Sequence, residues 1–133
     1  MATLHFELVA PERVLFSGEV TSVLIPGTDG DMTVLPGHAP VMSTLKAGFV
    51  VATDHRDHGI RILVRGGFAE INPAGVTVLA ERATPVEELS PEKLDHEILE
   101  LGTIRDGSSD HREREKLDMM IGQLEEAKAA LRV

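Results

Sequence analysis

The first two thirds of the chain alternate between short apolar-rich runs and turn-forming stretches. In "HFELV", residues 5–9, polar and apolar side chains alternate with a period of two, which is typical of a half-buried strand. Similar runs continue to about residue 86, and the stretches "TDGD", "DHRDHG" and "NPAG" between them favour tight turns. This pattern predicts about ten short strands over residues 1–86, arranged as an antiparallel β-sandwich or a flattened barrel.

After residue 88 the apolar residues recur at helical spacing instead. Ser90 is the expected N-cap of a first helix, and Pro91 suits its first position because proline lacks the amide hydrogen that would be unpaired there. One face of this helix carries three apolar residues, Leu94, Ile98 and Leu101. The spacings of four and three predict an amphipathic helix.

A second helix is predicted after the break at "RDGSSD". Ser109 is its expected N-cap, and the helix should run from about Asp110 to Arg132. Its apolar residues repeat at spacings of three and four, as in a coiled-coil seam: Leu117, Met120, Leu124, Ala127 and Leu131. Two helices and a short loop predict an antiparallel hairpin over residues 87–133. We expect it to be marginally stable alone, because few apolar side chains oppose the entropy cost of ordering about 40 residues.

The composition narrows the possible functions. Aromatic residues make up 3% of the chain, and the formal net charge is −9. Nucleic-acid-binding surfaces rely on basic and aromatic side chains, so we expect no nucleic-acid partner. The absence of cysteine excludes disulfides, thiolate metal sites and cysteine nucleophiles. Neither a signal peptide nor an apolar run of about 18 residues is visible, so we expect no direct membrane insertion.

One histidine occupies an unusually rigid setting. In "TVLPGHAPV", residues 33–41, His38 lies between Pro36 and Pro40. A general base or a metal ligand needs partner groups, and no neighbouring pattern of Ser, His or carboxylate supplies a triad. From the residues alone, His38 could be catalytic, a structural corner, or a stiff part of a protein interface.

Two further patterns have a structural interpretation beside a functional one. His55 and His58 in "DHRDH" could bind a metal, but structural zinc sites usually need four ligands, and we interpret the segment as a solvated turn. Gly66 and Gly67 could cradle a phosphate. No helix start follows them, so we expect a β-bulge or a close approach of strands.

Two long stretches of the chain resemble a known family. They are "FSGEVTSVLIPGTDGDMTVLPGHAPVMSTLKAGFV", residues 16–50, and "GGFAEINPAGVTVLAERA", residues 66–83. The chain resembles the epsilon subunit of bacterial rotary F-type ATP synthase, the equivalent of the mitochondrial delta subunit, over essentially its whole length. The absence of a transit peptide favours the bacterial form. The resemblance implies a non-catalytic central-stalk (rotor) subunit of proton-translocating ATP synthase, which couples rotation of the gamma shaft to the c-ring for ATP synthesis.

The resemblance also implies partners and contact residues. The sandwich would bind the gamma subunit and the polar loops of the c-ring. The implied c-ring contacts are Asp29, Gly30, Asp31 and Met32. The implied gamma contacts are His38, Ala39, Pro40, Val41 and Met42. His38 would then be held rigid as a corner of a torque-carrying interface, and no proton transfer would be required.

Some members of the family bind ATP through a first-helix motif of Ile or Leu, Asp, two variable residues, Arg and Ala. In this chain Leu94 and Asp95 match the motif, but Ile98 and Leu99 stand where the arginine and the alanine should be. Without the guanidinium group, a phosphate loses its bidentate partner. Arg112 or Arg114 could compensate, so ATP binding to the hairpin stays an open alternative, but we expect no cofactor there.

The second helix of the family can contact the alpha/beta catalytic head and inhibit ATP hydrolysis. Basic residues available for such contacts are Arg112, Arg114, Lys116 and Lys128. Interleaved acidic residues nearly balance them, so an ordinary solvated face remains an open alternative. The resemblance implies a peripheral position on the cytoplasmic face of the bacterial inner membrane.

A different class of function also has to be considered. The chain could be a stand-alone ligand-binding β-sandwich module, or a small hydrolase. A carbohydrate-binding module would normally expose an aromatic platform, and four Phe without Trp or Tyr do not supply one. A hydrolase would need a convergent nucleophile and base, which the sequence does not show.

Overall fold

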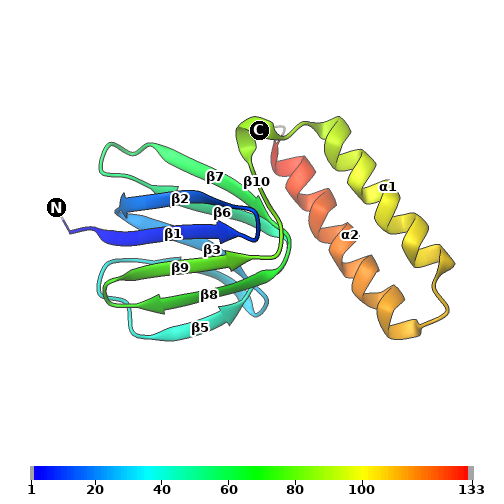
Figure 1. Cartoon of the computed structure of the whole chain (residues 1–133), viewed down its shortest axis with the longest axis horizontal. Helices are drawn as coiled ribbons and strands as arrows, with labels where there is room; N and C mark the ends of the chain where they lie inside the picture. The colour runs from blue at the N-terminus through cyan, green and yellow to red at the C-terminus, as the bar shows by residue number, and fades with distance from the viewer. Residues whose placement is uncertain (1, 132–133) are drawn as a thin grey trace. The chain divides into compact units, whose positions relative to one another are not determined.

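The computed structural model describes residues 2–131. It contains ten strands, one short 3₁₀ helix and two α-helices (Figure 1). The strands are β1 (Leu4–Ala10), β2 (Arg13–Val20), β3 (Ser22–Gly27), β4 (Gly30–Val34), β5 (Val41–Thr44), β6 (Gly48–Thr53), β7 (Gly59–Val64), β8 (Gly67–Asn72), β9 (Gly75–Ala80) and β10 (Ala83–Pro85). The helices are η1 (Val86–Glu88), α1 (Pro91–Gly107) and α2 (His111–Leu131). The chain divides into two compact units, Met1–Val86 and Glu87–Val133.

The first unit is a sandwich of two five-stranded sheets. Their strand orders are β2-β1-β9-β8-β5 and β10-β7-β6-β3-β4. The predicted β-sandwich is therefore confirmed, with one correction to its antiparallel character. Strands β1 and β9 pair in parallel. A parallel pair needs a long connection, which the distance between these strands in the sequence provides. The other strand pairs that the structure describes are antiparallel.

The core of the sandwich follows from the alternation along its strands. In β1, Leu4, Phe6 and Leu8 are buried, while His5 between them is exposed. The inner faces of both sheets contribute one hydrophobic cluster with exposed fractions of 5% or less. Since successive side chains of a strand point to opposite faces, the alternate residues of the first sheet form an outer surface available for function.

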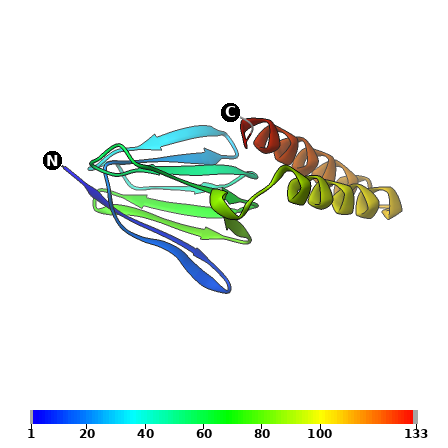
Figure 2. The same ribbon diagram turned by 90° about the horizontal axis from the view of Figure 1, so that it is seen from above.

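The second unit is the predicted pair of helices, which run side by side (Figure 2). Ser90 caps α1 as predicted: its side-chain oxygen accepts a hydrogen bond from the Lys93 amide at 3.2 Å. The cap predicted at Ser109 is wrong by one residue. Asp110 takes that role, since its Oδ1 accepts a hydrogen bond from the Arg112 amide at 3.0 Å. The predicted end of the second helix at Arg132 lies outside the described residues.

The buried side chains of the helices differ in part from the predicted stripe. The buried apolar residues of α1 and α2 in the described chain are Leu94, Ile121, Leu124 and Ala127. Ile121 was not in the predicted seam, while Leu117 and Met120 are only half-buried. The side chains at 121, 124 and 127 lie three apart, so the buried stripe drifts around the helix and does not follow the alternating three-and-four spacing of a coiled-coil seam. Neither helix in the described part of the chain is long and apolar enough to cross a membrane.

Candidate functional site

The corner that contains His38 is built on a tight turn. The His38 amide donates a hydrogen bond to the Leu35 carbonyl oxygen at 3.2 Å, which closes a four-residue turn with Pro36 second and Gly37 third. Gly37 has a φ of 83°, a conformation that L side chains rarely adopt. Proline followed by glycine is the pattern of a type II β-turn. The Gly37 amide also donates to the Pro73 carbonyl at 3.1 Å, which ties the corner to the β8–β9 turn.

The imidazole of His38 is hydrogen-bonded to the backbone of the next residue. Its Nδ1–H donates a hydrogen bond to the Ala39 carbonyl oxygen at 2.7 Å, and the residue is half-buried. Within residues 2–131 the ring has no carboxylate or hydroxyl partner. The residues that follow expose apolar surface: Val41 is 38% exposed and Met42 is 64% exposed. The geometry of this corner therefore suits an interface better than proton transfer.

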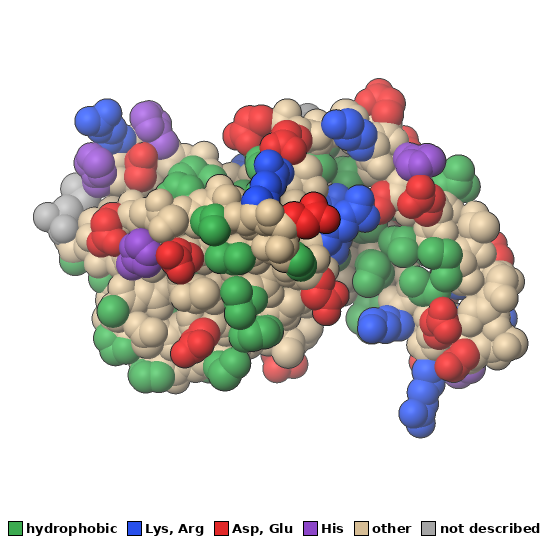
Figure 3. All heavy atoms as spheres, in the orientation of Figure 1, with side chains coloured by type: hydrophobic (Ala, Val, Ile, Leu, Met, Phe, Trp, Pro, Cys, Tyr) green, Lys and Arg blue, Asp and Glu red, His purple; other side chains and the backbone are tan. Residues whose placement is uncertain are grey.

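At the other end of β5, the outer face of the first sheet carries a row of mostly apolar side chains that crosses all five strands. Five cross-strand partners form what we call the apolar row: Thr44, Phe68, Leu79, Val9 and Val14. Phe68, Leu79 and Val14 are 37%, 41% and 60% exposed. Figure 3 shows hydrophobic side chains on this face of the sandwich. A monomer rarely exposes so continuous an apolar stripe unless a partner covers it.

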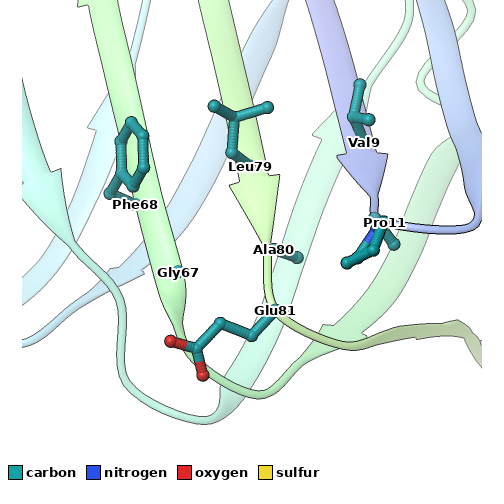
Figure 4. Close-up of a pocket in the computed structure, with 8 residues that line it drawn as sticks. Val9, Pro11, Gly67, Phe68, Leu79, Ala80 and Glu81 are labelled. Carbon is teal, nitrogen blue, oxygen red and sulfur yellow. The ribbon is translucent and has the colours of Figure 1, made fainter.

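The apolar row borders a groove of about 360 Å³ at the ends of β1, β8 and β9. Its lining residues are Val9, Ala10, Pro11, Gly67, Phe68, Leu79, Ala80 and Glu81. Phe68 and Leu79 stand side by side above it, and the carboxylate of Glu81 lies at one end (Figure 4). The groove can accept an apolar side chain, and Glu81 favours a neighbouring positive charge.

Gly67 makes the close strand approach that the sequence predicts at the glycine pair. A Cβ at this position would lie 2.2 Å from the Leu79 carbonyl oxygen, and the φ of Gly67 is 120°. Both the short distance and the positive φ mean that any residue other than glycine would require a shift of the backbone. Gly67 therefore shapes the groove by bringing β8 and β9 together.

Sequence reasoning missed Val9, Phe68 and Leu79 as candidate contact residues. A signal was present, because each is an apolar residue on the polar phase of an alternating strand. Single exposed apolar residues are common, however, and need no explanation. Only the register of the four strand pairs shows that they form one row.

Away from the apolar row, the same face becomes acidic. His5 Nδ1 lies 3.0 Å from Glu19 Oε2, and His5 Nε2 lies 3.6 Å from Glu7 Oε1. The hydrogen bond to Glu19, with a smaller contribution from Glu7, raises the pKa of His5. The outer face thus has an apolar end and a charged end.

The turn between β3 and β4 carries the predicted c-ring residues. Gly27 pairs with Gly30 across a two-residue loop, so Asp29 is at the tip and is exposed. Asp31 is exposed as well, with Lys46 Nζ 3.8 Å from its Oδ1. The side chain of Met32 packs against the core instead. The exposed part of the predicted surface is therefore Asp29, Gly30 and Asp31.

Strand β5 connects the two predicted contact regions of the sandwich. It starts directly after the corner at Pro40, and its last residue, Thr44, contacts the β3–β4 turn. The Thr28 amide donates to the Thr44 carbonyl at 3.0 Å, and the two hydroxyl groups lie 2.6 Å apart. A single four-residue strand thus links the corner to the acidic turn.

The predicted basic residues of α2 fall into two environments. Arg112, Arg114 and Lys116 are exposed in the first turns of the helix, and no ion pair of the described residues involves them. Lys128 instead forms an ion pair with Asp95 of α1. The two helices also line a groove of about 350 Å³, with Asp95, Ile98, Glu125, Lys128 and Ala129 at its walls.

The β6–β7 loop that contains His55 and His58 is an ordered hairpin turn. Asp54 Oδ1 accepts hydrogen bonds from the amides of Arg56 and His58 at 2.8 and 2.9 Å, and these bonds lower the pKa of Asp54. His55 and His58 are both exposed. Within residues 2–131, no group of three or more His, Cys, Asp or Glu side chains is placed to hold a metal ion.

Known proteins resemble both the sequence and the structure. Residues 3–86 match the family described as the ATP synthase Delta/Epsilon chain, beta-sandwich domain. The chain is 48% identical over 118 residues to an ATP synthase epsilon chain from Parvibaculum lavamentivorans, covering 88% of this chain and 89% of that one. It is 44% identical over 129 residues to an ATP synthase epsilon chain from a Chelativorans species, covering 97% and 96% of the two chains.

A solved structure is similar over the whole chain. A chain in the cryo-EM structure of the Euglena gracilis mitochondrial ATP synthase, OSCP/F1/c-ring, superposes with a TM-score of 0.80 at 25% identity. The similarity covers 98% of this chain and 82% of that chain. The family resemblance seen in the sequence is thereby confirmed, and the chain belongs to the ATP synthase epsilon-chain family, as a component of that enzyme complex.

Proposed function

We propose that this chain is the non-catalytic rotor subunit that joins the gamma shaft to the c-ring of a bacterial proton-translocating ATP synthase. The observation that carries the proposal is the pair of dissimilar surfaces on one rigid sandwich. One surface is made of the corner at His38 and the apolar row, which lie at opposite ends of β5, and the other is the acidic β3–β4 turn. Strand β5 links them directly, so a force applied at one is transmitted to the other.

The apolar row and the corner are proposed to bind the gamma subunit. Interfaces that hold partners firmly concentrate their affinity in a central group of buried aromatic and aliphatic side chains. Phe68, Leu79 and Met42 supply such a group, and the groove beside them accepts an apolar side chain. The rigid turn at Pro36–His38 reduces the entropy lost on binding.

The acidic turn is proposed to contact the c-ring. Asp29 and Asp31 are exposed at the tip of a short hairpin, and among the described residues only Asp31 has a cation within 4 Å, Lys46. A carboxylate pair of this kind complements polar loops that carry basic side chains. Its contribution is to orientation and register more than to affinity.

The helical hairpin is proposed to act on the alpha/beta catalytic head and to slow ATP hydrolysis, without bound nucleotide. The exposed Arg112, Arg114 and Lys116 support contacts with acidic segments. Among the residues that the structure describes, those lining the groove between the helices include no arginine for a phosphate, and Asp95 is already paired with Lys128. We place the assembled chain peripherally on the cytoplasmic face of the inner membrane.

A binding experiment tests the shaft contact. The full chain with Phe68→Glu, which puts a charge into the apolar row, should bind an isolated gamma subunit at least about tenfold more weakly, because an unpaired charge would be buried. His55→Glu, which adds the same charge to the exposed β6–β7 loop, is the matched control and should bind normally. Equal affinity of both variants for gamma would exclude this face as the shaft contact.

A hydrolysis experiment tests the role of the helices. Adding the full chain to the catalytic head depleted of it should lower the rate of ATP hydrolysis. Neutralising Arg112, Arg114 and Lys116 together to Gln should remove that effect while binding to gamma is kept. If the triple variant slows hydrolysis as strongly as the unmodified chain, the three basic residues are not inhibitory contacts.

A further inference from the structure

The two helices are joined by an ion pair at each end. Near the α1–α2 loop, Arg105 Nη1 lies 2.6 Å from Asp118 Oδ1. Near the open end, Lys128 pairs with Asp95. The residues of these pairs are 13 and 33 positions apart in the sequence, so each pair bridges the two helices and does not stabilise one helix alone.

We infer that the pairs Arg105–Asp118 and Asp95–Lys128 form an electrostatic latch that keeps α1 and α2 together and yields to ionic strength or to an acidic partner. The inference rests on the geometry of the hairpin and not on the proposed rotor role. It can therefore fail or hold independently of that role.

The pairs have the features of attractive contacts rather than chance proximity. The Arg105 guanidinium also contacts Asp106, with Nε 3.1 Å from Oδ1, so one cation serves two carboxylates. The hydrogen bond to Asp118, followed by the contacts with Asp106, raises the pKa of Arg105. The cations are the better-shielded partners: the side chains of Arg105 and Lys128 are 31% and 23% exposed, against 61% and 56% for Asp118 and Asp95.

The hairpin also has a short apolar seam. Its buried apolar side chains in the described chain are Leu94, Ile121, Leu124 and Ala127. Because the apolar seam is short, separating the two helices costs little free energy. A small electrostatic contribution then changes the populations of the closed and the separated hairpin measurably. Partly exposed pairs are also screened by salt, unlike apolar contacts.

The latch has a consequence that does rest on the proposed function. While the hairpin is closed, Lys128 and Arg105 are occupied by Asp95 and Asp118. On opening, both cations become available in addition to the exposed Arg112, Arg114 and Lys116. An acidic segment of a partner then competes with Asp95 and Asp118 for the same cations. Binding of the partner therefore favours the open hairpin, and opening favours binding.

Amide hydrogen exchange on the full chain tests the latch directly. Asp118→Asn and Asp95→Asn should each raise the exchange rates of amides in α1 and α2 by about 2- to 5-fold at low salt. The matched control is Glu126→Gln, which neutralises an exposed α2 carboxylate that has no ion pair among the described residues. The amides of β8 and β9 should keep their protection in every variant, which shows that the sandwich remains folded.

Reversing the charges of a pair distinguishes the loss of electrostatic attraction from the loss of the original side chains. The double variant Arg105→Asp with Asp118→Arg should exchange within about 2-fold of the unmodified chain, although it differs at both positions. At high salt, the amide exchange rates of Asp118→Asn and of the unmodified chain should become nearly equal, because salt screens the ion pair. The latch is rejected if the aspartate variants exchange no faster than Glu126→Gln, or if the reversed pair exchanges as fast as Asp118→Asn.

Discussion

The sandwich and the helical hairpin of this chain are stabilised by different means. The sandwich has one hydrophobic cluster to which the inner faces of both sheets contribute. The hairpin has a few buried apolar side chains and an ion pair at each end. Apolar burial is insensitive to salt and has no direction, whereas exposed ion pairs are weak and are screened. The 133-residue chain thus combines a rigid sandwich with a helical hairpin whose stability depends on ionic strength.

The largest expected effect is in the sandwich core. Phe6 is fully buried, and its ring stacks on Phe16 with centroids 5.3 Å apart. Phe6→Ala should lower the free energy of unfolding of the sandwich by about 3–5 kcal/mol, measured by urea denaturation. Val14→Ala, at a site that is 60% exposed, should change it by less than about 0.5 kcal/mol. A small effect of Phe6→Ala would contradict the view of the sandwich as the rigid part.

A cavity in the hairpin should destabilise the two helices and leave the sandwich unaffected. Leu124 is fully buried, and Leu124→Ala should destabilise the hairpin by about 2–3 kcal/mol, near the lower end of such substitutions because a small seam can partly collapse. Hydrogen exchange should accelerate in α1 and α2, while β8 and β9 stay protected. Met119→Ala, at a site 67% exposed on the same helix, is the control. Loss of protection in the strands too would break the distinction between the two units.

The start of α1 offers a smaller test of the hairpin. Ser90→Ala removes the hydroxyl group that accepts from the Lys93 amide and should cost about 1 kcal/mol of helix stability. Exchange of the first amides of α1 reports the loss. Ser90→Asp should restore protection, because aspartate caps equally well and favours the positive end of the helix. If both variants behave alike, the cap contributes nothing to this helix.

The smallest effect is a pH dependence confined to the sandwich. Glu19 and Glu7 raise the pKa of His5 above its ordinary 6.5. Because the folded pKa is higher than the unfolded one, the stabilisation is complete below pH 6.5 and is lost as the pH rises through the folded pKa. The urea midpoint of the sandwich should fall slightly between pH 6 and pH 8.5, and His5→Gln should remove that fall. An unchanged slope in His5→Gln would assign the pH dependence to another group.

Local structure was largely predictable from the residues. The period of two in "HFELV" identified β1, and Ser90 with Pro91 identified the start of α1. Both depend on neighbours within a few positions, where backbone geometry and capping act. The error at Ser109 has the same local origin, since Ser109 and Asp110 are both good caps and the sequence does not rank them.

The sequence by itself determined the change of period near residue 86, the rigid turn at Pro36–Gly37 and the family resemblance. The tertiary structure alone decided the parallel pairing of β1 with β9, the apolar row from Thr44 to Val14, and the two ion pairs between α1 and α2. The physical reason is distance along the chain. Strand register and interhelical contacts join residues many positions apart, and no local propensity specifies which of them will meet.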